Sequence, residues 1–511
     1  MKFSRRHFLK FTAAGVAASV VGPIGLDLTP EQAASLAARR QSGTLRIAWN
    51  PTFTLDPLSA SADSEISFLN AVYDYLIDTD AQSALVPRLA SEWAISDDGL
   101  AYTLKIREGV KFHDGSDLTV DDVIWTFNRL KTPETPTGNL YANIESIEAG
   151  ENNSVVFKLT NTNPDFLYDL SDNHAVILKA EAPDIGVEFN GTGPFKLAEF
   201  LAADRAVFSA NTDYWGGAPG VETLEFIYFD DNQAAVDALR GGIVDVAVRM
   251  DNATFLALAD ETGLSSVSLP TNGHDLVRLR SDREPGNNEK VRQAFKLATD
   301  RDEIFNRVQL GLGAVGRDSP IGPLFGDYYS EDTPLPARDP EAAKALLAEA
   351  GYPDGLDMTL YIPNTGDRPT LGEVLQAQWE EAGIRIQIEL QDEATYYGEN
   401  GWLEVDLGIT PWGSRPRPQF YLETSLKTGA VWNESHFSDD ELDALIATAG
   451  TTLDEQERID TYKEIQRILI ERGPIIVPYF FASLGISAES VQSFNMHPFP
   501  GRTNFNTVTI G

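Results

Sequence analysis

Strand-like and helix-like segments alternate along the chain from residue 43 onward, and this alternation restricts the fold more than any other feature. The segment 43–57 begins as a strand, because Leu45, Ile47 and Trp49 recur at every second position before a proline-containing loop. Strands interleaved with helices indicate α/β lobes. A chain of 511 residues is long enough for two to four domains at roughly 100 to 200 residues each. We therefore expect α/β lobes built from segments that are discontinuous in sequence.

Several helices are marked by their ends. Thr119 and Asp122 have the spacing of a capping box. The apolar face that follows consists of Val120, Val123, Ile124, Phe127 and Leu130. Asp339 caps a second helix, with proline in its first turn, and Gly351 ends it. A third helix leads into the alternating strand 384–390.

Composition limits the partners of the protein. The chain has 77 acidic and 40 basic residues and a formal charge of -37, so its surface repels phosphate backbones, and nucleic acid is excluded as a partner. It has no cysteine, which removes disulfides, thiolate metal sites, cysteine nucleophiles and a lipidated N-terminal cysteine. Beyond the first 25 residues no apolar run approaches the ~20 residues that span a bilayer.

The N-terminal segment has the layout of an export signal, with a basic start, a weakly apolar stretch and small residues after it. Within it SRRHFLK, residues 4–10, resembles the twin-arginine export motif. That resemblance implies passage through the twin-arginine translocase as a folded chain. We expect residues 1–43 to be signal peptide and linker, with a mature start between about 30 and 43. Since a released protein without a lipid anchor is retained only by an outer membrane, we expect a periplasmic location.

Motifs typical of enzymes are not met in their required context. GLGAVG, residues 311–316, matches GxGxxG, but it follows a helical stretch instead of a strand and is better explained as a helix end and turn. Lys427-Thr428-Gly429 matches one box of penicillin-recognising enzymes, yet the Ser-x-x-Lys nucleophile is missing. A GxxxxGK[ST] phosphate loop is also missing.

The histidines do not indicate a metal site. Those beyond residue 43 are His113, His174, His274, His436 and His497. No two of them lie within helical reach, so we expect neither a zinc site nor another cofactor. The FHDG sequence containing His113 is better explained as a turn in which Gly115 supplies an unusual backbone conformation.

The segment 85–131, which reads LVPRLASEWAISDDGLAYTLKIREGVKFHDGSDLTVDDVIWTFNRLK, resembles the signature of the extracellular solute-binding proteins of family 5. This family includes oligopeptide, dipeptide and nickel receptors of ABC importers. The resemblance continues in order through GTGPFKLAEF, NTDYWGGAPGVETLEFIYF, NNEKVRQAFKLATDRDEIF, ARDPEAAKALLAEAGYPDG and ERIDTYKEIQRILIERGPIIVPYF. It therefore covers nearly all of the chain beyond the signal.

The resemblance implies a two-lobed α/β binding protein of class II, of the three-domain oligopeptide-receptor type, that closes on its solute by a hinge. By analogy, the first domain combines residues 44–85, 186–277 and 478–511. The second domain is 86–185, and the other lobe is 278–477. The implied partners are a small solute and a membrane permease with its ATPase subunits, and the implied state is a monomer without cofactors.

One site residue departs from the family pattern. Peptide receptors of the family carry a stretch resembling W-x-x-D-Y-x-x-P, whose aspartate pairs with the peptide's amino group. Here the stretch reads PWGSRPRPQFYL, and Arg415 stands in place of that aspartate. An arginine offers a planar fork suited to carboxylate or phosphate, and Arg417 adds to it. Two roles remain open for Arg415, recognition of an anionic or polyhydroxyl solute, or an ion pair with a carboxylate of the protein.

The remaining candidates for the substrate-binding site come from loop positions by analogy. Trp412 or Trp432 would supply an apolar or sugar-stacking wall. The others are Asn50, Phe53, Tyr141, His274 and Asn433. Each is equally compatible with core or hinge packing.

Three classes of function remain open at this point. The leading one is a non-enzymatic transport receptor for a peptide, peptide-like, opine-like or oligosaccharide solute. A nickel or haem receptor is a variant of it. An exported hydrolase of the same architecture would show turnover, and a chaperone-like binder would lack one tight stoichiometric ligand.

Overall fold

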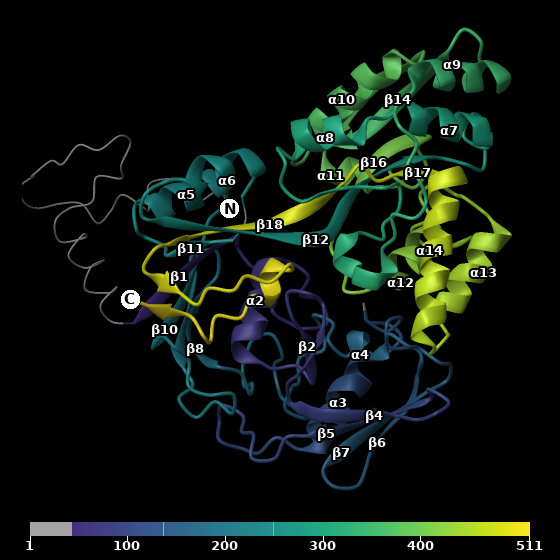
Figure 1. The fold of residues 1–511 in the computed structure, drawn as a ribbon. Helices are drawn as coiled ribbons and strands as arrows, with labels where there is room; N and C mark the ends of the chain where they lie inside the picture. Colours follow the sequence, from purple (N-terminus) through teal and green to yellow (C-terminus); the bar gives the residue numbers. More distant parts are fainter. Residues whose placement is uncertain (1–42, 136, 249) are drawn as a thin grey trace, which may run out of the picture.

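One twelve-stranded sheet extends through most of the described protein, in the order β15-β14-β16-β12-β18-β11-β1-β10-β9-β8, with β13 and β17 paired to its middle (Figure 1). The computed structural model describes residues 43–135, 137–248 and 250–511. The strands of this sheet are β1 (Thr44–Trp49), β8 (Phe195–Leu201), β9 (Arg205–Ala210), β10 (Thr223–Tyr228), β11 (Val246–Ala247), β12 (Leu264–Leu279), β13 (Ala314–Val315), β14 (Leu356–Pro363), β15 (Ile384–Gln391), β16 (Leu407–Trp412), β17 (Ile475–Ile476) and β18 (Tyr479–Ala488).

The long antiparallel strands β12 and β18 connect the two halves of this sheet. Their pairing runs from Leu264↔Ala488 to His274↔Phe480, with an irregularity between Pro270 and His274. Beyond that irregularity β12 also pairs with β16, from His274↔Trp412 onward. The first half of β12 therefore belongs with the early strands, while its second half belongs with the late ones.

A separate four-stranded sheet, in the order β4-β5-β7-β6, lies in residues 86–185, which we call the small-sheet region (Figure 1). Its strands are β4 (Ala90–Ile95), β5 (Ala101–Ile106), β6 (Ile144–Ala149) and β7 (Ser154–Leu159), and its helices are α3 (Val120–Leu130) and α4 (Phe166–Asp169). The predicted capping box of α3 is confirmed, because Thr119 accepts from the Asp122 N–H at 3.4 Å and Asp122 accepts from the Thr119 N–H at 2.8 Å. Gly115 has the predicted unusual backbone, with φ of 88°.

A buried carboxylate joins the small-sheet region to the rest of the early chain. Asp74 is fully buried and accepts hydrogen bonds from Arg88 at 2.7 Å, Tyr214 at 2.8 Å and Trp215 at 2.8 Å. The DYWGG sequence thus places two aromatic donors on one acceptor. Since each donor is satisfied by Asp74, this polar contact can be buried without leaving an unpaired group.

The late part of the chain, residues 278–477, forms what we call the second lobe. Its helices and helical turns are α7 (Glu289–Ala298), α8 (Arg301–Val308), η1 (Pro323–Tyr328), α9 (Pro340–Glu349), α10 (Arg368–Glu380), α11 (Glu393–Tyr396), α12 (Gln419–Tyr421), η2 (Leu422–Leu426), α13 (Asp440–Ala449) and α14 (Glu455–Arg472). The predicted cap is present, since Asp339 accepts from the Ala342 N–H at 2.9 Å. The strand predicted at 384–390 is β15, which pairs in parallel with β14.

The other elements lie within residues 63–87, 232–259 and 491–510. They are α2 (Asp63–Val72), β2 (Ile77–Thr79), β3 (Leu85–Pro87), α5 (Asn232–Arg240), α6 (Asn252–Ala259), β19 (Val491–Gln492), η3 (Pro500–Arg502) and β20 (Thr509–Ile510). The GLGAVG segment follows α8, as predicted, but it also contains the short strand β13, which the sequence analysis did not predict. No helix in the described ranges is long and apolar enough to cross a bilayer.

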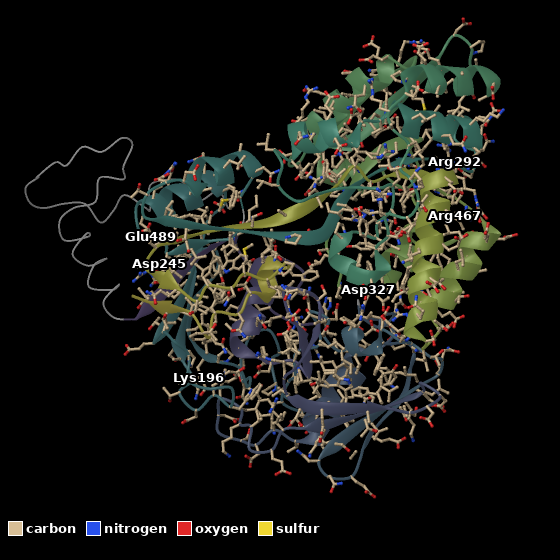
Figure 2. All side chains as sticks on the ribbon, viewed as in Figure 1. Lys196, Asp245, Arg292, Asp327, Arg467 and Glu489 are labelled. Carbon is tan, nitrogen blue, oxygen red and sulfur yellow. The ribbon has the colours of Figure 1, made fainter. Side chains whose placement is uncertain are left out.

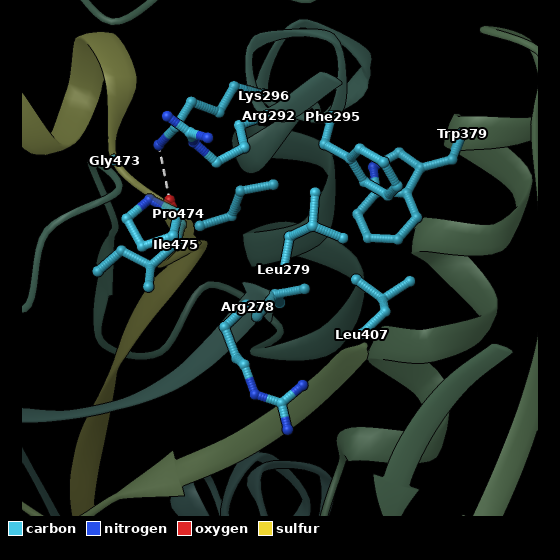
Figure 3. A pocket seen from close by; sticks show the side chains of 12 residues that line it. Arg278, Leu279, Arg292, Phe295, Lys296, Trp379, Leu407, Gly473, Pro474 and Ile475 are labelled. Carbon is cyan, nitrogen blue, oxygen red and sulfur yellow. Dashed lines mark hydrogen bonds between the residues drawn. The ribbon is translucent and has the colours of Figure 1, made fainter. Parts of the chain in front are cut away.

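The interior of the second lobe contains a buried cluster of three charges. Lys296 and Arg301 are both nearly inaccessible, and both bind Asp318, at 3.1 and 2.6 Å. Lys296 also donates to the carbonyls of Leu469 at 3.0 Å and Ile475 at 2.6 Å, and it lies with Arg292 above a small cavity that residues 473–475 help to line (Figure 3). Burial lowers the pKa of Lys296 to about 8, although Asp318 opposes this shift.

We expect the Asp318→Asn variant to lose about 3 to 5 kcal/mol of stability in the second lobe, because Lys296 and Arg301 would remain buried without a counter-charge. Urea unfolding followed by hydrogen exchange in α7 and α8 measures the loss. The matched control is Asp332→Asn, which removes an exposed partner of Lys463 in the same lobe and should change stability little. Equal effects of the two substitutions would contradict the prediction.

Candidate ligand-binding site

An aromatic cluster forms where β16 ends. It contains two of the predicted site residues, Trp412 and Trp432, together with Phe420. The ring centres of Trp412 and Trp432 are 6.0 Å apart, and those of Phe420 and Trp432 are 6.4 Å apart. Trp412 is buried, whereas Trp432 is 39% exposed. The cluster therefore combines a buried ring, that of Trp412, with the partly exposed ring of Trp432, whose apolar surface a ligand can reach.

A buried carboxylate holds Trp412 in this position. Glu434 accepts from the Trp412 indole at 3.1 Å, from Thr410 at 2.5 Å and from Arg278 at 3.1 Å. Burial raises the pKa of Glu434, and these three donors oppose that rise. The indole of Trp412 is thus oriented by a satisfied polar network and has little freedom to move.

Arg415 lies beside the aromatic cluster. Its guanidinium is 4.6 Å from the ring centre of Phe420, and its Nη1 donates to the Ser414 carbonyl at 2.9 Å. Within the described residues, no ion pair joins Arg415 to a carboxylate of the protein. Arg415 is half-buried, and a guanidinium has five N–H donors, of which the one on Nη1 is bound to Ser414.

The small-sheet region approaches the second lobe next to Arg415. The Arg417 guanidinium lies 3.8 Å from the ring centre of Tyr168, and its Nε is 3.4 Å from Oδ1 of Asp165. Arg458 binds the same carboxylate at 2.8 Å. Figure 2 labels Asp327 in η1, on the side of the second lobe that faces the small-sheet region.

A paired imidazole and carboxylate follow Tyr168 along the chain. His174 Nδ1 contacts Asp172, and both side chains are partly exposed. Burial alone would lower the pKa of His174, but Asp172 raises it above its usual value, and Arg415 acts in the opposite direction. Burial alone would raise the pKa of Asp172, but the contact with His174 and, to a smaller extent, the charge of Arg415 lower it below its usual value. The field of Arg415 therefore reaches the small-sheet region.

His274 lies directly behind the aromatic cluster. It is fully buried, pairs across the sheet with Trp412, and contacts the rings of Tyr421 and Phe480 at 5.1 and 5.5 Å. Its Nδ1 bonds to the Asn272 carbonyl at 2.9 Å. Burial lowers the pKa of His274 to about 4. Its position is that of a packing residue, and contact with a solute stays a prediction.

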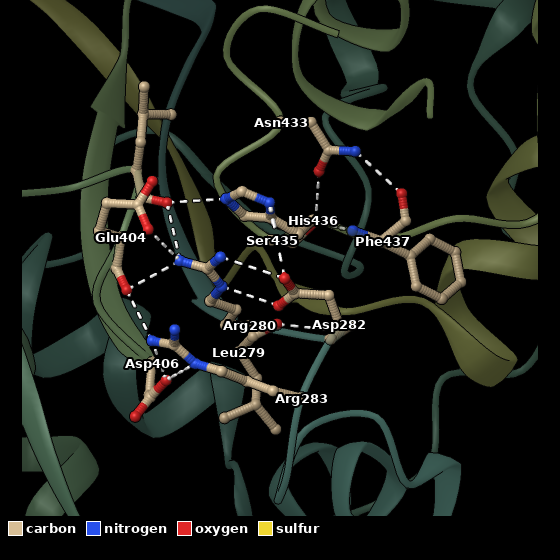
Figure 4. A network of polar contacts seen from close by, with 12 residues as sticks. Leu279, Arg280, Asp282, Arg283, Glu404, Asp406, Asn433, Ser435, His436 and Phe437 are labelled. Carbon is tan, nitrogen blue, oxygen red and sulfur yellow. Dashed lines mark hydrogen bonds and ion pairs between the residues drawn. The ribbon is translucent and has the colours of Figure 1, made fainter. Parts of the chain in front are cut away.

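Asn433 and Tyr141 are engaged by the protein itself. Asn433 donates to the Lys427 and Phe437 carbonyls at 3.1 and 2.9 Å and accepts from Ser435 at 2.8 Å (Figure 4). Tyr141 is 1% exposed and donates to the Asp169 carbonyl at 2.9 Å. Both have the contacts of structural residues, and their predicted roles in binding remain predictions.

The polar network around Asn433 also fixes the neighbouring loop (Figure 4). Arg280 binds Asp282 and Glu404, each at 2.7 Å, and His436 contacts the Leu403 carbonyl at 2.8 Å. This network connects the end of β12 to the segment before β16 and to the loop after Trp432. It supports the candidate site from behind.

The loop after β1 contains the last two candidates, Asn50 and Phe53. Glu65 fixes this loop by accepting from the Phe53 and Thr54 N–H groups, both at 2.9 Å. Phe53 is 90% exposed and Asn50 is exposed as well. The loop presents both residues to solvent, which is compatible with ligand contact, and their roles stay predictions.

The site has the chemistry of binding. In the described ranges, no group of three or more histidine, cysteine or carboxylate side chains is arranged to hold a metal ion. What the site offers is the Arg415 guanidinium, the partly exposed indole of Trp432 and, beside Arg417, the ring of Tyr168 from the small-sheet region. These groups can recognise an anionic or polar solute with an apolar part.

Comparison with known proteins places the chain in a family. The profile of the bacterial extracellular solute-binding proteins, family 5, matches residues 84–433. The chain belongs to this family. The resemblance proposed from the segment 85–131 is thereby confirmed, and with it the two-lobed α/β binding-protein fold, since solved structures of the family match nearly the whole chain.

Two curated relatives and one solved structure illustrate the similarity. The chain is 26% identical to haem-binding protein A of Haemophilus influenzae, over 89% of this chain and 88% of that protein. It is 26% identical to the dipeptide-binding protein of Escherichia coli, over 88% of this chain and 90% of that one. The structure of HbpA2 from Haemophilus parasuis superimposes with a TM-score of 0.80 at 26% identity, covering 92% of this chain and all of that one.

The export prediction is also confirmed. The twin-arginine translocation signal matches residues 2–22, which lie outside the described residues, as does the predicted cleavage region up to residue 42. This family-5 protein is therefore a periplasmic solute-binding receptor of the kind that serves ABC importers, and members of its family are binding proteins.

Sequence reasoning missed the contact between the small-sheet region and the second lobe beside Arg417. Asp165, Tyr168 and Arg458 meet there, although Asp165 and Arg458 are 293 positions apart in sequence. No spacing rule connects residues so distant. The one sequence signal near this contact is the PWGSRPRP stretch, because it contains Arg417, which pairs with Asp165.

We expect protonation of His274 to contribute to acid unfolding. Its pKa is about 4 in the folded protein against about 6.5 ordinarily, so the folded state binds fewer protons between these values. Its contribution of about 3 kcal/mol is present above pH 6.5 and is lost as the pH falls towards 4.

The His274→Phe variant cannot be protonated there, so its stability relative to the wild type should improve steadily from pH 7 to pH 4.5. Urea unfolding at half-unit pH steps measures this difference. At pH 8 the imidazole of His274 is neutral in both the folded and the unfolded protein. The difference in stability between variant and wild type at that pH therefore measures the packing change alone. A constant difference across the whole pH range would contradict the assignment.

Proposed function

We propose that this receptor captures a small solute that carries an anionic group, such as a peptide-like, opine-like or oligosaccharide acid. The observation that carries the proposal is Arg415, a half-buried guanidinium with unused donors beside the exposed indole of Trp432. A carboxylate or phosphate can take two parallel N–H bonds from such a group. The peptide amino group that an aspartate would bind at this position is disfavoured next to a guanidinium.

The proposal includes closure of two lobes on the solute. We infer a first lobe in which residues 44–85, 186–277 and 478–511 form one domain and 86–185 another, with 278–477 as the second lobe. The separate apolar clusters on either side of the β12–β18 crossing support the division into two lobes, while a single cluster spans both proposed domains of the first lobe. The closed monomer would deliver the solute to a membrane permease and its ATPase subunits.

No chemical step is part of the proposed function. The relatives described above are named for binding haem and dipeptides. Retention of an intact solute by the purified protein, with no turnover of it, is the behaviour we expect.

The test begins with native mass spectrometry of the purified protein and identification of any retained solute. Calorimetry with that solute should then give an affinity about 10 to 150 times weaker for Arg415→Gln, which is the effect of losing a charged hydrogen bond. The matched control is Arg385→Gln, which removes an exposed arginine of β15 that pairs with Asp357.

Two results would contradict the proposal. An affinity of Arg415→Gln within twofold of the wild type would remove Arg415 from the site. Release of a chemically altered solute would instead indicate an enzyme.

A further inference from the structure

Asp165 makes the closest polar contact between the small-sheet region and the second lobe at this end of the molecule. Its Oδ1 accepts from Arg458 at 2.8 Å and lies 3.4 Å from Nε of Arg417. The Asp165 and Arg458 side chains are only 9% and 3% exposed. One buried carboxylate therefore serves two guanidiniums, and all three charges belong to the protein.

Aromatic rings complete this contact. Arg417 lies between Tyr168 of the small-sheet region, 3.8 Å away, and Tyr328 of the second lobe, 5.3 Å away. Arg458 also donates to the hydroxyls of Tyr328 and Tyr462, at 3.1 and 3.2 Å. Rings above and below a guanidinium exclude water, which strengthens its attraction to a nearby carboxylate.

The side chain of Asp165 has a single role in the described structure. Arg458 holds Tyr328, Tyr462 and the Ala449 carbonyl within its own lobe, so replacing it would disturb that lobe. The Asp165 side chain, in contrast, has its ion pairs with Arg417 and Arg458, and its second oxygen has no hydrogen-bond partner among the described residues. Changing Asp165 therefore isolates the contact between the two regions.

We propose that Asp165, Arg417 and Arg458 form a latch that stabilises the closed arrangement of the lobes without any contribution from a solute. The proposal rests on the hinge closure proposed above. A solute then adds its contacts to a closed state that the latch already favours, so the position of the open–closed equilibrium depends on both. Loss of the carboxylate leaves Arg417 and Arg458 facing each other as like charges, which favours opening.

The latch is tested by measuring the distance between the lobes directly. The chain has no cysteine, so Glu108→Cys and Glu373→Cys, at exposed positions on the two sides, provide two specific spin-label sites. Double electron–electron resonance is recorded on protein that native mass spectrometry shows to be free of solute. We expect a short distance in the latched protein and a longer distance in Asp165→Asn, with the closed-to-open ratio falling about tenfold or more.

Glu148→Gln is the matched control. It also removes one acidic charge from the small-sheet region, but its partner Lys158 lies in the same sheet, so the distance should not change. Arg417→Gln removes the partner of Asp165 in the second lobe, so it should lengthen the distance between the labels as Asp165→Asn does. If Asp165→Asn fails to fold, the distance in Arg417→Gln tests the latch. Unchanged distances in folded Asp165→Asn, or in Arg417→Gln where the first variant does not fold, would overturn the latch. This readout needs no solute, so it is independent of whether Arg415 binds one.

Discussion

The pairing of β12 with β18 is the constraint on which the rest of this structure depends. Both strands run from the early part of the sheet into the second lobe, and β12 changes neighbours from β18 alone to β16 as well near His274. This hydrogen-bonded crossing fixes where Trp412 and the loop after it lie. The candidate site is therefore placed by backbone pairing, and its side chains are then oriented by local contacts.

Many of those local contacts share one arrangement, in which several donors surround a buried carboxylate. Buried carboxylates are used as shared acceptors, as Asp74 serves two aromatic donors and Arg88, Glu434 serves Trp412, and Asp318 serves two cations. A buried charge is tolerated only when its partners compensate for the lost hydration. Arg415 does not follow this pattern, since it lies half-buried without such a partner in the described structure, and our proposal that it binds the solute rests on this exception.

The helices and strands were largely predictable because their signals are local. Thr119 with Asp122, and Asp339, gave the helix starts, and the alternation at 384–390 gave β15. The site residues stay predictions. Trp432 and Arg415 contact Phe420 and Trp412 contacts Trp432, whereas Tyr141 and Asn433 are held by the protein's own carbonyls. A sequence does not distinguish an aromatic or amide side chain that packs from one that binds, since both fit the same local pattern.

By itself, the sequence determined the α/β class, the export signal, the family and the reversed charge at position 415, because each of these is encoded by neighbouring residues. Only the tertiary structure decided which groups pack against Arg417 and Arg458. Asp165 and Tyr168 reach Arg417 and Arg458 across hundreds of positions, through the folding of two separate regions onto one another. Contacts of that kind depend on how whole sheets and helices pack, and no local period or spacing encodes them.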